Sequence, residues 1–219
     1  MIPAKATSER IKNKNMRLLC RKPLVQWTIE AALKSEVFTD VIVSSEDEAT
    51  LALAQKLGAR PFKRSPELAS HTATTWQVCK EVLEFIKADS FALLLPTSPF
   101  RTSQDIENAC GVFESPDVSC LLSVSEFDYP PQWALVMEGD RVRPVNFATI
   151  GKIRQELAKW YKHDGSIIMA KTEAFLKAGD WLEMQPIPWF TPEERNIDLD
   201  TLEDFRRAEY LCFEDGGGI

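Results

Sequence analysis

A chain of 219 residues with 44% hydrophobic side chains suits one globular domain, or one domain with a small appendage. Asp and Glu outnumber Lys and Arg by 33 to 26, and the formal net charge of −7 argues against a general affinity for nucleic acid or anionic membranes. No apolar run reaches about 18 residues and the polar start does not resemble a signal peptide, so we expect a cytoplasmic protein without a membrane segment.

Helical and strand-like segments alternate over the first half of the chain. After a basic opening loop, the residue patterns predict a helix at residues 23–35, a strand at 40–44, helices at 46–58 and 75–87, a strand at 90–95, a helix at 104–113 and a strand at 118–124. Pro23 opens the first helix and Gly58 ends the second. The strands are short and apolar on both faces. This order predicts an α/β fold in which helices cover both faces of a parallel sheet.

The alternation stops after Ser125. Residues 127–160 contain two adjacent prolines and a Gly139-Asp140 turn without a repeating pattern, which is typical of a hairpin insertion, a lid or an oligomer contact. A strand at 165–170 and helices at 172–178 and 202–213 follow. We therefore expect a domain over residues 1–213 and a disordered tail at 214–219.

The opening loop is the first candidate for a site, because ligands of open α/β sheets bind at the carboxyl ends of the strands. In an otherwise acidic chain, this loop gathers cations and hydroxyls, namely Lys5, Thr7, Ser8, Arg10, Lys12 and Lys14. Such groups suit a triphosphate, since they offset its charge and donate hydrogen bonds. A solvated N-terminal tail is the alternative, and composition alone favours the tail.

A second candidate loop is LLLPTSPFR (residues 93–101). Its two prolines fix the backbone just past a buried strand, where they would present Thr97, Ser98 and Arg101 at the carboxyl end of that strand. A plain structural turn explains the same residues equally well, so the sequence leaves both interpretations open.

A third candidate is NIDLD (residues 196–200), in which Asp198 and Asp200 would share one face of a strand. Two carboxylates on one face can hold Mg²⁺ together with substrate phosphates. The alternative is that Asp200 or Thr201 caps the helix that starts near Leu202. The two interpretations are compatible, and the spacing favours a metal role.

The remaining reactive residue types have simpler interpretations. His71 and His163 lack triad partners and are interpreted as surface or loop histidines. The acidic residues 46–48 complement a helix dipole. The five cysteines are scattered, odd in number and never spaced as C-x-x-C, so we expect buried thiols in a reducing compartment at positions 20, 79, 110, 120 and 212.

Several longer segments follow one another in a recognisable order. They are IPAKATSERIKNKN (residues 2–15), RLLCRKPLVQWTIEAALKSEVFTDVIVSSEDE (17–48), PELASHTA (66–73), LLLPTSPFRTSQDI (93–106), RQELAKWYKHDGSIIMA (154–170) and IDLDTLEDFRRAE (197–209). Together they resemble the cytidylyltransferases that activate nonulosonic acids, the CMP-sialic acid synthetases and their relatives for legionaminic and pseudaminic acid. The segments cover most of the chain, and their order makes the resemblance specific.

The resemblance implies a Rossmann-like three-layer nucleotidyltransferase fold with a mostly parallel sheet and a small insertion. It also implies transfer of CMP from CTP to the anomeric hydroxyl of a nonulosonic acid, with release of pyrophosphate and with Mg²⁺ as cofactor. The expected partners are CTP and a nonulosonic acid, without nucleic acid or membrane. A homodimer is expected, with residues 127–160 as the region that reaches the partner subunit.

The resemblance further implies roles for individual residues. Lys14 and Asp200 would act in catalysis, and Asp198 and Asp200 would hold the metal ion. The nucleotide would be bound by Lys5, Ser8, Arg10, Asn15 and Thr74. The sugar acid would be bound by Thr97, Ser98 and Arg154, the last because a guanidinium offers two parallel donors to a carboxylate.

This chain departs from the family pattern mainly at the phosphate loop and the sugar pocket. Lys5 replaces an arginine, Ala6-Thr7 a Gly-Gly pair, Glu9 a lysine, Lys12 a proline, Arg21 a glycine, His71 an aspartate, Leu95 a glutamine, Asp164 an asparagine and Ile168 a tyrosine. Alanine and threonine adopt a positive φ less readily than glycine. Few residues precede the loop for the apolar strand expected there. The retained Lys14, Asn15, Arg154, Asp198 and Asp200 favour an active enzyme over a relative with weakened catalysis.

Three other functions are weighed against this one. A CMP-Kdo synthetase is the nearest, but there G-K-P-L directly follows the arginine, whereas Lys14-Asn15 comes first here. A non-catalytic nucleotide- or sugar-binding protein would bind CTP without releasing pyrophosphate. A glycosyltransferase that uses its Asp-x-Asp is less favoured, because the pair lies near the C-terminus rather than after a central strand.

Overall fold

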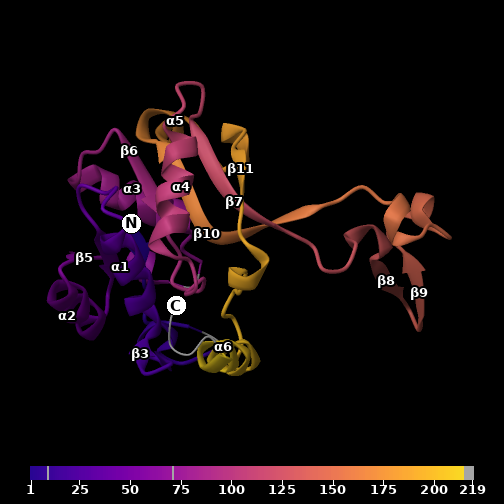
Figure 1. Cartoon of the computed structure of the whole chain (residues 1–219), viewed down its shortest axis with the longest axis horizontal. Coiled ribbons are helices and arrows are strands. Elements are labelled where there is room, and N and C mark those ends of the chain that lie inside the picture. Colours follow the sequence, from indigo (N-terminus) through magenta and orange to yellow (C-terminus); the bar gives the residue numbers. More distant parts are fainter. Residues whose placement is uncertain (9, 71, 215–219) are drawn as a thin grey trace.

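The centre of the molecule is a sheet made of a three-stranded and a four-stranded part (Figure 1). The structure is a computed structural model that describes residues 1–8, 10–70 and 72–214. The strand order of the sheet is β5 (Arg60–Lys63), β4 (Ile42–Ser45), β1 (Ile2–Pro3), β6 (Ser90–Leu93), β10 (Tyr161–Lys171), β7 (Cys120–Glu126) and β11 (Ile187–Phe190). The amine of Met1 donates to the Ala92 carbonyl at 2.6 Å, and the Leu94 amide donates to the Met1 carbonyl at 3.0 Å. These two hydrogen bonds join β1 to β6 in parallel register.

Most neighbouring strands run in the same direction. β1, β4 and β5 are parallel, and β11 runs parallel to β7, whereas β10 lies antiparallel between β6 and β7. The mostly parallel, Rossmann-like sheet is therefore confirmed. β10 is longer than the predicted strand at residues 165–170, and the residue patterns did not predict β5 and β11. The strand that the resemblance places before the basic loop is present as the two-residue β1.

Helices cover both faces of this sheet. α1 (Leu24–Lys34), α2 (Glu48–Leu57) and α4 (Ser103–Phe113) share one apolar cluster with the sheet, while α3 (Thr75–Phe85) and α5 (Thr172–Lys177) share another. α6 is Leu202–Glu214. The predicted helices are confirmed with ends within two residues of those expected. Gly58 ends α2 with φ 93°, as predicted, whereas Pro23 is the N-cap of α1 rather than its first helical residue.

Short elements complete the connections. Two small antiparallel hairpins pair β2 (Leu18–Leu19) with β3 (Lys22–Pro23) and β8 (Leu135–Glu138) with β9 (Arg141–Pro144). Short 3₁₀ helices lie at Lys14–Met16, Glu67–Ala69, Pro131–Trp133, Phe147–Thr149, Arg154–Glu156, Leu182–Met184 and Glu193–Arg195. None of the helices in the described ranges combines the length and apolar character that crossing a bilayer requires.

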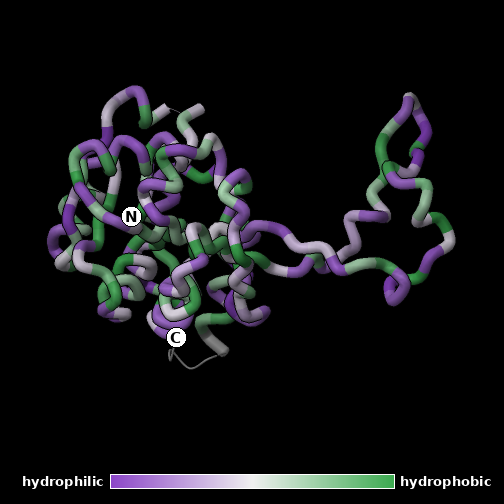
Figure 2. The backbone as a smooth tube through the Cα atoms, turned by 90° about the horizontal axis from the view of Figure 1, so that it is seen from above, coloured by the Kyte–Doolittle hydropathy of each residue, from purple (hydrophilic) through white to green (hydrophobic). Residues whose placement is uncertain are grey.

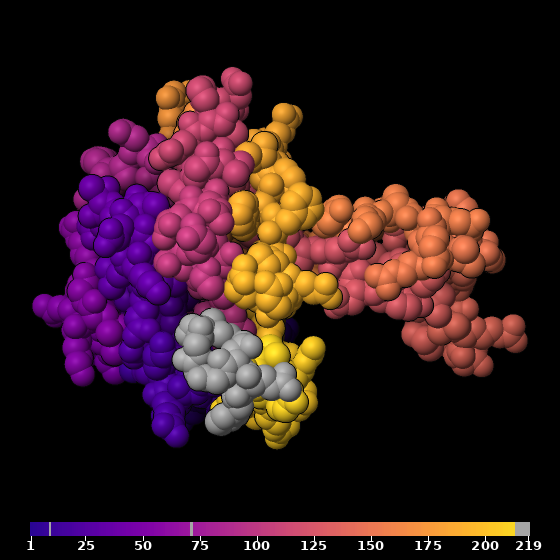
Figure 3. All heavy atoms as spheres, viewed as in Figure 1, coloured from indigo at the N-terminus to yellow at the C-terminus, as the bar shows by residue number. Residues whose placement is uncertain are grey.

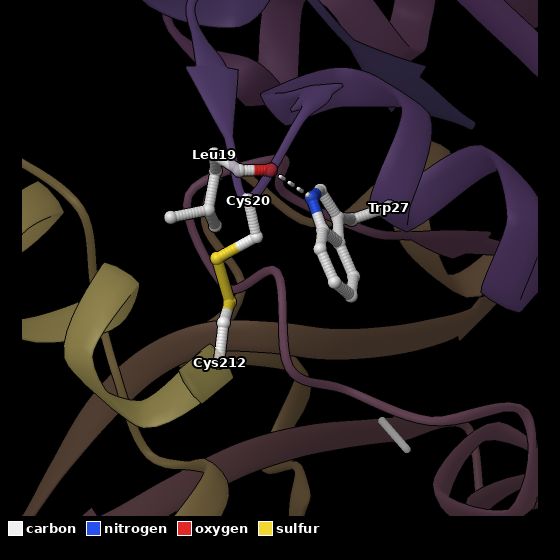
Figure 4. Close-up of a disulfide and its surroundings, with 4 residues drawn as sticks. All are labelled: Leu19, Cys20, Trp27 and Cys212. Atoms are coloured by element: carbon white, nitrogen blue, oxygen red, sulfur yellow. Dashed lines mark hydrogen bonds between the residues drawn. A yellow bond between two sulfur atoms is a disulfide. The ribbon is translucent and has the colours of Figure 1, made fainter. Parts of the chain in front are cut away.

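A third apolar cluster lies between the β2–β3 hairpin, α1 and α6, and it contains a disulfide (Figure 4). Cys20, in the hairpin turn, is bonded to Cys212 of α6, so the expectation that all five cysteines are thiols is wrong for these two. The pairing could not be read from the sequence, because 192 residues separate the partners and only folding brings them together. Cys79 and Cys120 are buried free thiols as expected, and Cys110 is a half-buried one.

Residues 127–160 leave the body as a long arm (Figures 1 and 3). The arm carries the β8–β9 hairpin, whose turn contains Gly139 with φ 66°. It contributes no side chain to the three apolar clusters of the described residues. Figure 2 shows apolar segments along the arm, away from the body. Glu9, His71 and residues 215–219 lie outside the part of the chain that the structure describes. The interpretations of Glu9, of His71 and of most of the tail therefore stay predictions.

The separation of arm and core predicts that the body folds without the arm. The Phe127 amide donates to the Trp160 carbonyl at 3.1 Å, so an Asn-Gly turn replacing residues 128–159 would close the β7–β10 hairpin without distortion. We expect the melting temperature of this variant to lie within about 3 °C of that of the wild type at a concentration where the wild type is monomeric, since less than roughly 1 kcal/mol of packing within one chain is lost.

A core substitution provides the contrast in the same thermal unfolding measurement. Ile106 is fully buried, and Ile106→Ala should lower the melting temperature by roughly 5–15 °C, in keeping with about 2–5 kcal/mol for such a truncation. An arm-deleted variant as unstable as Ile106→Ala would contradict the division into body and arm.

Candidate active site

A cavity of about 310 Å³ opens where the loop after β1 meets the segment before α6. It is lined by Lys5, Thr7, Ser8, Arg10, Lys14, Asn15 and Asp200. All of these side chains are polar or charged, and most of them are cations or hydroxyl donors. The two segments lie far apart in the sequence, and both were candidates for a site. The structure thus brings the basic loop and Asp200, one of the acidic pair, together around one cavity.

Asp200 is the carboxylate that faces the cations. Its Oδ1 accepts from the Nζ of Lys14 at 3.1 Å, and its Oδ2 accepts from the Nη1 of Arg10 at 2.7 Å. Lys14 also donates to the Leu199 carbonyl at 2.9 Å, and its side chain is only 15% exposed. Arg10 is solvated at 67% exposure, so its pair with Asp200 adds little to stability. Lys14 is therefore the fixed cation of the site and Arg10 the movable one.

Backbone and side-chain hydrogen bonds hold the basic loop in place. Asn15 is buried, and its Nδ2 donates to the Lys5 carbonyl at 2.8 Å, which closes the loop on itself. The Ala6 amide donates to Oε1 of Glu46 at 2.7 Å, and the Thr7 hydroxyl donates to the Ala69 carbonyl at 3.0 Å. The loop is thus not the solvated tail that composition alone favoured.

Asp198 and Asp200 flank a buried residue in an extended segment that pairs with no strand. Leu199 is fully buried in the third cluster, and its amide donates to the Thr97 carbonyl at 2.9 Å. This anchor directs the two carboxylates outward, as the alternation predicted. Ahead of the segment, Arg195 forms a bidentate pair with Asp105 of α4, with N–O distances of 2.9 and 3.0 Å (Figure 3 shows this segment running along α4).

The cap of α6 does not use Asp200. Thr201 Oγ1 accepts from the Asp204 amide at 3.2 Å, while Oδ2 of Asp204 accepts from the amides of Thr201 and Asp200 at 2.7 and 3.1 Å. Of the two proposed caps, Thr201 is therefore the one observed. The Asp200 carboxylate remains directed at the cavity.

The pKa of the Asp198 carboxyl lies above its ordinary value of 3.8. The main cause is partial loss of hydration of the carboxyl group, and the negative charge of Asp200 adds to it, whereas a hydrogen bond from Thr97 and the Lys14 charge oppose it. A divalent cation bound by both carboxylates would remove this repulsion. The described residues offer no cluster of three or more His, Cys, Asp or Glu that could hold a metal ion, so phosphate or water oxygens would complete the coordination.

Three residues assigned to ligands through the resemblance are engaged elsewhere. Thr74 is exposed and caps α3, where its hydroxyl accepts from the Gln77 amide at 3.2 Å. Ser98 is buried, and its hydroxyl donates to the Asp164 carbonyl at 3.4 Å. Arg154 lies on the arm, where it lines a separate cavity of about 410 Å³. None of the three lines the cavity around Asp200.

The second candidate loop divides in the structure. Thr97 contacts the acidic segment, as described above, whereas Arg101 is buried and donates to the Thr28 hydroxyl of α1 at 2.9 Å and to the Ser166 carbonyl of β10. Ser98 and Arg101 therefore have structural roles in this turn, whereas Thr97 contacts the acidic segment of the site. The pattern could not separate the two, because side chains of one turn point in different directions.

The positions that depart from the sugar-pocket pattern lie in β10, at Asp164 and Ile168, or beside it, at Leu95. Gly165 has φ +70°, and a Cβ there would approach Leu95 Cδ1 to 2.6 Å. Asp164 is buried and accepts from the Ser123 hydroxyl and the Ser166 amide. The imidazole of His163 accepts from the Gly165 amide at 2.9 Å, and burial lowers its pKa below the ordinary value. His163 is exposed, as expected of a surface histidine, and its ring nitrogen also supports the β10 bulge.

Sequence reasoning missed two residues that shape the site. Glu46 was assigned to a helix dipole, but its carboxylate holds the Ala6 amide, while Asp47 is the N-cap of α2. Arg195 fixes the acidic segment onto α4. No local pattern signals either contact, because the partners lie 40 and 90 residues away.

The sequence matches a protein family and resembles several named proteins. The family model described as cytidylyltransferase matches residues 1–198. The chain is 32% identical to the N-acylneuraminate cytidylyltransferase of Escherichia coli O18:K1:H7, covering 95% of this chain and 50% of that protein. It is also 32% identical to the CMP-N,N'-diacetyllegionaminic acid synthase of Legionella pneumophila, covering 96% of this chain and 94% of that protein. The chain thus spans about half the length of the N-acylneuraminate enzymes it matches.

A solved structure shows the same fold. The CMP:2-keto-3-deoxy-manno-octonic acid synthetase complexed with CTP aligns with a TM-score of 0.72, covering 98% of this chain and 97% of that one. The two sequences are only 16% identical, so the likeness concerns the arrangement of the chain alone.

The raised pKa of Asp198 predicts that this residue lowers stability when no cation is bound. Because the pKa of Asp198 in the folded state is above its ordinary value of 3.8, the folded state binds the proton more tightly than the unfolded state does. The charged carboxylate therefore destabilises the folded state at neutral pH. We expect Asp198→Asn to raise the melting temperature by roughly 1–2 °C at pH 7 in a chelator, since solvent screening limits the effect to a fraction of 1 kcal/mol.

The pH dependence of the melting temperature shows whether the charge of Asp198 causes this gain. The gain of Asp198→Asn should fade as the pH falls toward 4, where the wild-type carboxyl takes up its proton. Asp117→Asn, which removes an exposed carboxylate from the loop before β7, is the matched control and should leave the melting temperature unchanged. A gain that persists unchanged at pH 4 would contradict this explanation.

Proposed function

The chain belongs to the cytidylyltransferase family, and from this premise we propose that it transfers CMP from CTP to the anomeric hydroxyl of a nonulosonic acid. The observation that carries the proposal is the cavity in which the cations Lys5, Arg10 and Lys14 face Asp200. This arrangement suits a nucleoside triphosphate, because cations and backbone-anchored donors offset the phosphate charge. Two relatives that match nearly the full length of both chains are the pseudaminic acid cytidylyltransferase of Campylobacter jejuni and the CMP-N,N'-diacetyllegionaminic acid synthase of Legionella pneumophila.

The reaction is an in-line displacement at phosphorus. The anomeric 2-hydroxyl oxygen attacks the α-phosphorus of CTP, the bond to the bridging oxygen breaks, pyrophosphate leaves and the hydroxyl proton is released. Such a reaction depends on positioning and charge neutralisation more than on covalent chemistry. Lys14 suits this task because its ammonium is already fixed by the Leu199 carbonyl and Asp200. Arg10 is free enough to exchange its ion pair for a phosphate contact.

We assign the metal site to Asp198 and Asp200. Their carboxylates and the raised pKa of Asp198 fit a hard divalent cation such as Mg²⁺. Mg²⁺, when bound, would neutralise charge on the phosphates. The chain's own part is to hold the two carboxylates outward by burying Leu199 between them and by fixing the segment through Arg195.

The changes in the phosphate loop are compatible with activity. Neither Ala6 nor Thr7 has a positive φ, so the loop does not need the Gly-Gly pair that the family pattern has at these positions. Serine, lysine and asparagine at positions 8, 14 and 15 surround the cavity as the assignment requires. The proposal therefore places a working enzyme ahead of a relative that only binds CTP.

The first test is pyrophosphate release from CTP and Mg²⁺ with a panel of sialic, legionaminic and pseudaminic acids, with ATP, GTP and UTP as controls. We expect release with CTP and one acid only. Asp200→Asn should lower kcat/KM by about 10²–10³-fold, as loss of a group that stabilises transition-state charge does. Glu203→Gln, which removes an exposed carboxylate of α6 paired with Arg206, is the matched control and should retain activity.

Two outcomes would overturn parts of this assignment. Pyrophosphate release by Asp200→Asn at the rate of Glu203→Gln would exclude the metal role of Asp200. Silence across the panel, with CTP still raising the melting temperature, would favour a CTP-binding protein without catalysis.

We propose that the arm joins two copies of the chain in a homodimer. Its hairpin and flanking turns expose a group of large apolar side chains, each at least 58% accessible, namely Leu135, Met137, Val142, Val145, Phe147, Ile150 and Ile153. An isolated arm with so much apolar surface favours association. Arg154 lies on the same arm and not at the cavity of its own chain, so a role in sugar binding requires the arm of a second copy.

Deletion of the arm tests this part of the proposal. The wild type should elute as a dimer in size-exclusion chromatography with light scattering, and the variant with residues 128–159 replaced by Asn-Gly should be a monomer. Arg154→Ala, which leaves the apolar surface intact, should remain dimeric and serves as the control. A monomeric wild type at tens of micromolar would contradict the dimer.

A further inference from the structure

We propose that Cys20 and Cys212 form a redox modification site whose oxidation state sets the affinity of the cavity for CTP. The inference rests on the proposed function for the identity of the ligand. It rests on the structure for the site itself, which is a disulfide between the β2–β3 turn and α6 (Figure 4).

The disulfide connects the two segments that line the cavity. The basic loop passes through the 3₁₀ helix Lys14–Met16 directly into β2, and Cys20 follows β2. Asp200 lies two residues before α6, and Cys212 lies on α6. The disulfide is therefore a second connection, in addition to the Lys14–Asp200 contact, between these two parts of the chain. The two cysteines are 192 residues apart in the sequence.

The bond lies within the same apolar cluster that supports the site. Cys20 and Cys212 pack with Ile11 of the basic loop and Leu199 of the acidic segment, together with Leu19 and Phe205. Next to the disulfide, the indole Nε1 of Trp27 donates to the Leu19 carbonyl at 3.2 Å, as Figure 4 shows. A shift of α6 against the hairpin would thus move the residues that flank Lys14 and Asp200.

The turn that carries Cys20 is held in an uncommon conformation. Cys20 and Arg21 form the two-residue connection of the β2–β3 hairpin, with φ of 49° and 71°. Residues with a Cβ enter this left-handed region at an energetic cost, and hairpin turns of this kind favour Asn and Gly. The disulfide is one of the restraints on this turn, and its reduction frees the turn to relax.

The other cysteines are poorly suited to exchange. Burial raises the pKa of the Cys79 and Cys120 thiols to about 12, and that of Cys110 is raised by burial and by Glu114. A thiolate is the attacking species in thiol–disulfide exchange, so these three remain unreactive near neutral pH. Cys20 and Cys212 are each only partly buried, in contrast to the buried Cys79 and Cys120.

The reductant is a dithiol. Its thiolate attacks one sulfur of the pair, the Sγ–Sγ bond breaks, and a mixed disulfide forms while the other cysteine leaves as a thiolate. The second thiol of the reagent then displaces the remaining cysteine. Two electrons pass from the dithiol, which becomes a cyclic disulfide, and Cys20 and Cys212 end as thiols with the two protons of the reagent.

Titration with CTP in the presence of Mg²⁺ tests the proposal on the full chain. We expect reduction with dithiothreitol to weaken the calorimetric Kd for CTP by about 3–10-fold. A change of this size is typical of a weak coupling between the state of one site, here the disulfide, and the ligand affinity of another. The double variant Cys20→Ser/Cys212→Ser should show the weaker Kd with or without the reagent. Cys110→Ser, a control that leaves the pair intact, should behave as the wild type.

The outcomes separate this inference from the proposed function. Equal affinities of oxidised and reduced wild type, or five titratable thiols in denatured protein purified without reductant, would overturn the redox site and leave the proposed function untouched. Absence of CTP binding in both redox forms would overturn both. Thermal unfolding of each sample shows whether the reduced protein and the double variant are folded, and the comparison within the wild type needs no substitution.

Discussion

The ammonium of Lys14 joins the two halves of the cavity, and the arrangement of the remaining groups depends on this contact. Its partners, the Leu199 carbonyl and the Asp200 carboxylate, come from a segment 185 residues away. Because the ammonium is largely shielded from water, this ion pair is less screened than a pair on the open surface. The basic loop and the acidic segment are each anchored independently, by Asn15 and by Leu199. The site is therefore preorganised before any ligand enters it.

The parts of the fold that follow from local patterns were predictable. The helices and the central strands β4, β6 and β7 lie where the hydrophobic periodicity and the length of each segment predicted them. β1 and β11 were not, because a two-residue strand and a strand with a proline carry too little local signal. The acidic pair was predicted because alternation around Leu199 is a local property. The contacts of Glu46, Arg195 and Cys212 are tertiary, and a single sequence does not contain them.

Of the residues that the resemblance assigns to ligands, some lie around one cavity and others lie elsewhere. Lys5, Ser8, Lys14 and Asp200 are among those that line the cavity. Thr74 and Ser98 stand at the expected places in the sequence, but their hydroxyls serve a helix cap and a buried turn. A motif specifies where a residue lies along the chain. The direction of its side chain is decided by hydrogen bonds that nearby backbone groups must satisfy.

The position of β10 has a consequence for how the chain folds during synthesis. This strand lies between β6 and β7, yet it follows both in the sequence and comes after the whole arm. Until residues 161–171 leave the ribosome, β6 and β7 each present an edge with unpaired backbone groups, an arrangement that invites wrong pairings between nascent chains. The sheet is therefore completed late, through contacts between distant residues, and such topologies fold slowly. An arm that separates early from the body leaves the gap between β6 and β7 open for the strand that must enter it.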